Sequence, residues 1–156
     1  LAYMPFIYEH PVYWQKIEEE TKGSGDIERS TCLFIDSENA REHTEEEMIP
    51  VENIKGRLFL VGAEDDSFWE TGKYIRRMDE RLKERPHTCE YVPLVYEHGT
   101  HFVLPESLLR KALPVGLKFV MRLIFKAAKE YPNECEKTRK DIDRRLSSAL
   151  KEWREE

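Results

Sequence analysis

The chain has few cysteines, and their spacing does not indicate a disulfide framework. The cysteines form an odd set with no CxxC pair: Cys32, Cys89 and Cys135. An odd set argues against a closed disulfide network, and the missing CxxC spacing argues against a zinc site. Three histidines also lack partners at ligand spacing: His10, His43 and His87. We therefore expect a reduced, cytoplasmic protein with no metal and no cofactor.

A long apolar run is missing as well. No segment reaches the about 20 apolar residues that span a bilayer, and the N-terminus shows no basic stretch followed by an apolar one. We therefore expect no membrane partner. The formal net charge is -6, with acidic residues grouped at Glu18–Glu20 and Glu45–Glu47. Because no face is obviously prepared to neutralise phosphates, we expect no nucleic-acid partner either.

What the sequence does contain is the composition of a folded protein. Hydrophobic residues make up 40% and charged residues 36% of the 156 residues. This length supports one core, so we expect residues 1–156 to form a single domain or one continuous part of a larger domain. The first residue is Leu1 and not methionine, which suggests processing or a fragment of a longer polypeptide.

The middle of the chain shows the pattern of a strand, a helix and a second strand. Residues 57–61 form a short apolar run that ends at Gly62, typical of a strand buried on both faces of a parallel sheet. Residues 68–85 carry apolar positions every three or four residues, which predicts an amphipathic helix. Residues 88–95 favour a strand, and Pro93 places it at a sheet edge. Together they predict a parallel βαβ unit and an α/β fold class.

Helices are expected on both sides of this unit. Residues 1–56 are expected to form a connection and a helix over 36–48. Residues 107–156 are expected to be helical, with a short helix over 107–113 and a helix over 115–131 that is apolar on more than one face and therefore buried. The last helix follows Pro132 and carries an apolar stripe: Ile142, Leu146, Leu150 and Trp153.

Acidic residues and a histidine follow the two predicted strands. Asp65 and Asp66 come after the first strand, and His101 comes after the second. Ligands of open α/β sheets bind beyond the carboxyl ends of the strands, where neighbouring loops converge. A carboxylate that orients a histidine, which in turn activates a nucleophile, needs this adjacency. The sequence therefore predicts an acid–base pair that joins residues 57–106 into one functional unit.

The nucleophile that would complete such a triad is not found in the chain. Acid before histidine is the order of the α/β-hydrolases, in which the serine precedes both. No GxSxG or GxCxG motif occurs in the sequence. We therefore expect the C-terminal portion of an α/β-hydrolase fold whose nucleophile-bearing half is absent, and we expect the chain alone to be inactive.

Each candidate residue also has an ordinary structural interpretation. Asp66 could cap the helix that follows it, and His101 could be a core or loop histidine. His98 is interpreted as a loop residue. Trp69 is interpreted as core packing before it is considered as a wall of a substrate site.

Motifs on both sides of the acid and the histidine resemble one enzyme family. Residues 49–56 read IPVENIKG, residues 64–69 read EDDSFW, and residues 99–105 contain GTH followed by LP. These segments are similar to the C-terminal part of the acyl-CoA thioesterase and bile acid-CoA:amino acid N-acyltransferase family. The resemblance covers residues 1 to about 106, and residues 115–131 look like an insertion.

The resemblance implies roles for individual residues. Asp66 falls on the family acid, with Asp65 as the alternative, and His101 falls on the family base. Trp69 is a weak candidate for substrate contact. Ala63 and His98 stand where the family pattern has glycine, which leaves the sub-family and the substrate open.

The resemblance also implies an activity and partners. A parent protein would use a serine or cysteine to hydrolyse or transfer the acyl group of an acyl-CoA, and the missing N-terminal half would be this chain's partner. A carboxylesterase or dienelactone-hydrolase-like enzyme is the alternative, because the same triad serves ester and thioester. A catalytically inactive fragment or interaction module is the non-enzymatic alternative, and a second copy of the chain is a candidate partner in a homo-oligomer.

Overall fold

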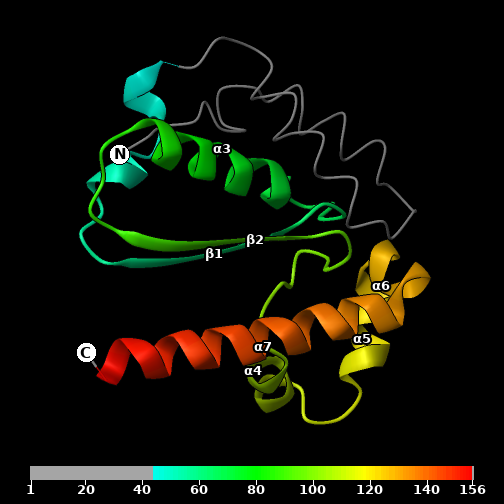
Figure 1. Ribbon diagram of the computed structural model, residues 1–156. Coiled ribbons are helices and arrows are strands. Elements are labelled where there is room, and N and C mark those ends of the chain that lie inside the picture. The colour runs from blue at the N-terminus through cyan, green and yellow to red at the C-terminus, as the bar shows by residue number, and fades with distance from the viewer. Residues whose placement is uncertain (1–43, 156) are drawn as a thin grey trace.

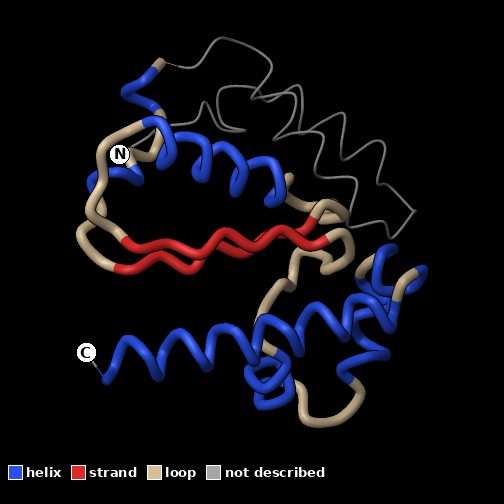
Figure 2. Tube along the Cα trace, in the orientation of Figure 1, coloured by secondary structure: helices blue, strands red, loops and turns tan. Residues whose placement is uncertain are grey.

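The computed structural model describes residues 44–155, which form a two-stranded parallel sheet with helices on both sides (Figure 1). Figure 2 shows α3 on one side of the strands and α7 on the other. This is the organisation of an α/β fragment. The elements in chain order are η2 (Glu45–Glu47), η3 (Val51–Asn53), β1 (Arg57–Ala63), α3 (Thr71–Glu84), β2 (Glu90–Tyr96), α4 (Glu106–Ala112), α5 (Leu117–Ile124), α6 (Lys126–Glu130) and α7 (Pro132–Glu155).

The first strand is two residues longer than expected, so Gly62 lies inside β1 and not after it. Gly62 and Ala63 pair with the end of β2. A Cβ atom at Gly62 would lie 2.8 Å from the carbonyl carbon of Thr71, so only glycine lets α3 begin directly against the strand. The expected burial on both faces is wrong for most of β1, because only Gly62 and Ala63 are buried and the rest is half-buried beside a single neighbouring strand.

The helix between the strands begins later than expected. We expected a helix over 68–85, whereas α3 starts at Thr71, because residues 66–69 form a turn of their own. Ile75 and Leu82 are buried against the sheet side of α3. On its outer side Arg81 donates to Glu52 of η3 at 2.5 Å, and this guanidinium lowers the pKa of Glu52 to about 2.

The second strand confirms the parallel pairing that the sequence predicts. β2 covers 90–96, close to the expected 88–95, and all seven of its residues pair with β1 in parallel register. Pro93 stands opposite Leu60 and is exposed. Proline is tolerated here because, in the part of the chain that the structure describes, β2 has a neighbouring strand on one side only.

The apolar segment over 115–131 is two helices, not the single helix expected. α5 ends at Ile124, Phe125 is extended (φ -116°, ψ 127°), and α6 begins at Lys126. The side chain of Phe125 is 2% exposed and lies edge-on to the rings of Phe68 and Phe102, at centroid distances of 5.5 and 5.3 Å. The break places this ring in the core.

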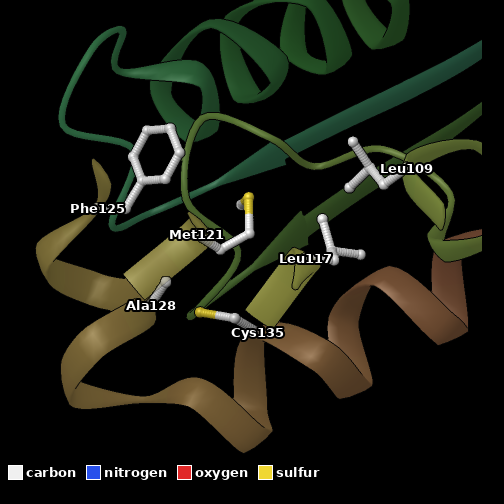
Figure 3. Close-up of a cluster of buried hydrophobic side chains, with 6 residues drawn as sticks. All are labelled: Leu109, Leu117, Met121, Phe125, Ala128 and Cys135. Carbon is white, nitrogen blue, oxygen red and sulfur yellow. The ribbon is translucent and has the colours of Figure 1, made fainter. Parts of the chain in front are cut away.

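Two buried clusters lie at opposite ends of the sheet. The first joins α4, α5, α6 and α7 and is drawn in Figure 3: Leu109, Leu117, Met121, Phe125, Ala128 and Cys135. The second lies under η3 and α3 at the start of β2: Val51, Leu82 and Cys89. The carboxyl ends of the strands therefore abut the first cluster.

The last helix packs along the sheet with a stripe that differs from the expected one at one position. Ile142 is 1% exposed, but Leu150 is 53% exposed and Ala149 is buried in its place. The helix contacts the strands near its middle and near its C-terminal end, because Tyr96 donates to Asp141 at 2.8 Å and Arg57 lies 5.6 Å from the ring centroid of Trp153.

Most of the N-terminal region lies outside the described residues. This applies to the expected connection over 1–35 and to the part of the expected 36–48 helix before Thr44. The end of that helix is the short 3-10 turn η2. In the described part of the chain, no helix combines the length and the apolar character that crossing a membrane requires.

Candidate acid–base site

The loops after β1 and β2 bring Asp66 and His101 into contact. His101 Nδ1 lies 3.1 and 3.2 Å from the two carboxylate oxygens of Asp66. A carboxylate only accepts hydrogen bonds, so Nδ1 carries the proton of this contact. In a neutral ring with this tautomer, the opposite nitrogen, Nε2, is the acceptor. The contact expected from the strand–helix–strand order is present.

The Asp66 carboxylate is fixed by further donors. Its side chain is fully buried, and its Oδ1 accepts the backbone N–H groups of Phe68 and Trp69 at 3.0 and 3.1 Å. Its Oδ2 accepts the Thr71 hydroxyl at 2.8 Å. A buried carboxylate needs such partners, and here they also fix its orientation. Asp66 does not cap α3, since the N-cap position is Glu70.

Asp65 contacts a different histidine. Its Oδ2 lies 3.1 Å from His98 Nδ1, and its Oδ1 accepts the backbone N–H groups of Gly99 and Thr100, both at 2.9 Å. The carboxylate therefore ties the loop after β1 to the loop that carries His101. Asp65 has no contact with His101 of the kind that Asp66 makes.

His98 is the second anchor of this loop. Its ring stacks on Tyr131 at a centroid distance of 3.8 Å, and its backbone carbonyl accepts the Thr138 hydroxyl of α7 at 2.5 Å. His98 lies in a loop, as expected. The sequence did not predict its contacts with Asp65 and Tyr131.

The backbone just before His101 is strained. Thr100 has φ 65° and is the one non-glycine residue with positive φ among residues 44–155. A β-branched residue rarely adopts this conformation, which costs about 1–3 kcal/mol. Its neighbour Gly99 has no room for a side chain, because a Cβ atom would lie 2.6 Å from Val103 Cγ1 and 2.9 Å from Ala63 Cβ. The contacts of Asp65 hold this loop in place.

Aromatic rings line the imidazole of His101. Trp69 stacks parallel to it at 6.4 Å, and Phe68 and Phe102 lie at 5.4 and 6.0 Å. Trp69 is 38% exposed, and the His101 side chain is 35% exposed. The histidine therefore has an apolar surround with one side open to solvent.

Neither described cysteine offers a reactive thiol beside His101. Burial raises the pKa of Cys135 to about 11, so its thiol is protonated at neutral pH and is a poor nucleophile. Cys89 is buried in the second cluster, at the other end of the sheet, next to His87. Residues 44–155 contain no group of three ligands that could hold a metal ion. Cys32, His10 and His43 lie outside the described residues.

Two residues of the site were not expected from the sequence. Thr71 donates to Asp66 and also accepts the backbone N–H of Ala63 at 3.1 Å. Its position, five residues after the acid and first in the helix, is the signal that could have identified it. Phe125 reaches the rings around His101 from a distant segment, and no local pattern predicts that contact.

We expect the neutral His101 ring to carry its proton on Nδ1. Multiple-bond 15N–1H NMR spectra of the 156-residue chain should show a protonated Nδ1 and an unprotonated Nε2. Asp66→Asn should abolish this tautomer preference, since the amide no longer demands a donor. Asp65→Asn is the matched control and should change the His98 signals while leaving the His101 tautomer intact. A dominant Nε2–H tautomer of His101 in the parent chain would contradict the pairing.

The comparisons with known proteins support one family. Searches of curated proteins and of solved structures gave no significant match. A family profile, described as the BAAT / Acyl-CoA thioester hydrolase C terminal, matches residues 12–107. This range contains both loops of the acid–base pair and ends at the start of α4. The chain therefore belongs to the BAAT / acyl-CoA thioester hydrolase C-terminal family.

Proposed function

We propose that this chain supplies the acid and the base of an α/β-hydrolase triad that acts on acyl-CoA thioesters. The observation that carries the proposal is the buried Asp66 carboxylate bound to Nδ1 of a part-exposed His101. Membership of a family of acyl-CoA thioester hydrolases and acyltransferases supports the substrate class.

In the proposed mechanism, His101 moves the proton. Its Nε2 takes the proton of a serine or cysteine as this nucleophile attacks the thioester carbonyl. The C–S bond then breaks, and Nε2 returns the proton to the CoA thiolate that leaves. The same nitrogen then activates the acceptor, water or an amine, that releases the acyl group. Asp66 keeps the ring in the required tautomer and stabilises the imidazolium that forms. The donors that Phe68, Trp69 and Thr71 aim at Asp66 hold the carboxylate still during this transfer.

The nucleophile is proposed to come from outside these 156 residues. No GxSxG or GxCxG motif occurs in the sequence, and the pKa of Cys135 is too high for a thiolate at neutral pH. Backbone donors for the oxyanion would belong to the same missing half. The strained turn at Thr100 supports the assignment, because such strain is concentrated at functional sites.

Reconstitution tests this proposal. The 156-residue chain should release no free CoA from short or long acyl-CoA. A longer polypeptide that adds the preceding nucleophile-bearing region should release it, and replacing the nucleophile with alanine should abolish the release. Turnover by the short chain would contradict the proposed missing nucleophile. A folded longer polypeptide that is inert toward thioesters and activated esters would favour the interaction module.

A further inference from the structure

The segment over 107–129 contains basic residues and no acidic ones. Its six basic residues are Arg110, Lys111, Lys118, Arg122, Lys126 and Lys129, and all six are exposed. The chain as a whole carries a net charge of -6. The segment is therefore positively charged in a protein whose net charge is negative.

Apolar side chains project from the same segment. Leu117 and Met121 of α5 point into the buried cluster of Figure 3. Phe119 and Leu123 each follow one of them by two residues, a rotation of about 200° around a helix, and they are 66% and 69% exposed. Val115, in the loop before α5, is 88% exposed. The expected burial of this segment is thus correct for one face and wrong for the other.

The basic charge is only partly neutralised by neighbouring acids. Lys118 pairs with Glu136, which also pairs with Lys140, and Lys126 pairs with Glu130. Arg110 pairs with Glu106, whose other partner is Arg139. Each of Glu106 and Glu136 thus faces two cations.

Three cations of the segment have no acidic partner within residues 44–155: Lys111, Arg122 and Lys129. One lies on α4, one on α5 and one on α6. The segment therefore keeps a positive charge that its acidic neighbours do not neutralise, and Arg122 of this set is adjacent in α5 to the exposed Leu123.

From this juxtaposition we propose that α5 and the loop before it dock on the surface of an anionic lipid bilayer. Phe119, Leu123 and Val115 enter the interface, and the basic residues around them contact the lipid headgroups. A helix with apolar residues on one face and Lys or Arg beside them lies in the membrane plane in this way. Figure 1 shows α5 beside α6, on the side of α7 away from α3.

Sequence alone led us to expect no membrane partner, since no run is long enough to span a bilayer. A peripheral contact needs only an exposed amphipathic face, which the sequence does not reveal until the buried side of α5 is known. The segment also lies almost wholly beyond residues 12–107, the range that the family profile matches. The face is therefore additional to the part of the chain that the profile matches, which contains the acid–base site.

A bilayer fits this face better than a second copy of the chain or a peptide does. A two-fold contact with a second copy would set Arg122 and its basic neighbours against their own copies, which is unfavourable. A peptide partner is usually held in an apolar groove, whereas Phe119, Leu123 and Val115 project outward with most of their area exposed. Apolar residues that project outward beside cations can instead insert into the interface of an anionic lipid bilayer.

Co-sedimentation of the 156-residue chain with vesicles tests the proposal. We expect binding to vesicles of phosphatidylcholine with about one third phosphatidylserine, much weaker binding to phosphatidylcholine alone, and loss of binding at high salt. The double variant F119S/L123S and the charge reversal R122E/K129E should each weaken binding at least about tenfold. All four positions are exposed, so circular dichroism should show an unchanged fold.

Matched changes on α7 serve as controls. Leu150→Ser alters another exposed apolar residue and Lys151→Glu reverses another exposed cation, and both variants should bind as the parent does. Equal binding to neutral and anionic vesicles, or binding that survives the α5 variants, would overturn the proposal. So would a concentration-dependent dimer in analytical ultracentrifugation that F119S/L123S dissolves, because the second copy would then occupy the face.

Discussion

Replacing His101 with alanine, in a longer polypeptide that also carries the nucleophile, should lower kcat for acyl-CoA hydrolysis by about 10⁵-fold. The methyl group has no nitrogen to accept the nucleophile's proton or to return it. KM should change little, because the imidazole is proposed to act in proton transfer and not in holding CoA. Steady-state release of CoA, with folding checked by circular dichroism, measures the effect.

Variants of the two neighbouring acids should differ in their effect on kcat in the same assay. Asp66→Asn should cost about 10⁴-fold in kcat, since the amide no longer selects the Nδ1–H tautomer that leaves Nε2 free. Asp65→Asn should cost only about tenfold, because an asparagine oxygen can still accept from Gly99 and Thr100 and the contact to His101 remains. This contrast distinguishes the acid from the residue that positions its loop.

The outcome of these variants can also contradict the assignment. If Asp65→Asn lowers kcat by about 10⁴-fold while Asp66→Asn and His101→Ala are both mild, Asp65 is the acid and His98 becomes the candidate base. His98→Ala decides between the two histidines. It should leave more than about a tenth of kcat, because His98 is placed as an anchor stacked on Tyr131.

The part of the fold around the site was predictable because its signals are local. A short apolar run, a helical period and a strand with an edge proline predict the βαβ unit, and parallel pairing then brings the loop of Asp66 to the loop of His101. Motifs on both sides of the pair resemble the family that the profile then identified. The acid–base contact needed no knowledge of side-chain packing.

Features that depend on distant contacts were not predictable in the same way. No proline or glycine at Phe125 predicts the break between α5 and α6. The break exists because the Phe125 ring packs against Phe68 and Phe102. The extension of β1 through Gly62 depends on where α3 begins. The apolar stripe of α7 passes through Ala149 and not Leu150, since only the helix's packing partners decide which side is inside.

Glu106→Gln should destabilise the chain by about 3 kcal/mol. Glu106 begins α4, is 5% exposed and accepts from Arg139 at 2.7 Å, and Arg139 is only 2% exposed. The variant keeps the size of the side chain but leaves a buried guanidinium without its counter-charge. Breaking a buried pair from one side is costly for this reason. Urea unfolding monitored by circular dichroism measures the change.

The exposed partner of the same carboxylate provides the control. Arg110 binds Glu106 at 2.8 Å, but its own side chain is 52% exposed, so Arg110→Ala should cost less than about 1 kcal/mol. The double change E106L/R139M removes both buried charges and should recover most of the loss, because an apolar pair of similar volume needs no counter-charge. If Glu106→Gln and Arg110→Ala destabilise equally, the buried pair with Arg139 does not anchor α4 to α7. The position of α4 would then rest on the apolar contacts of Leu109 in the first cluster.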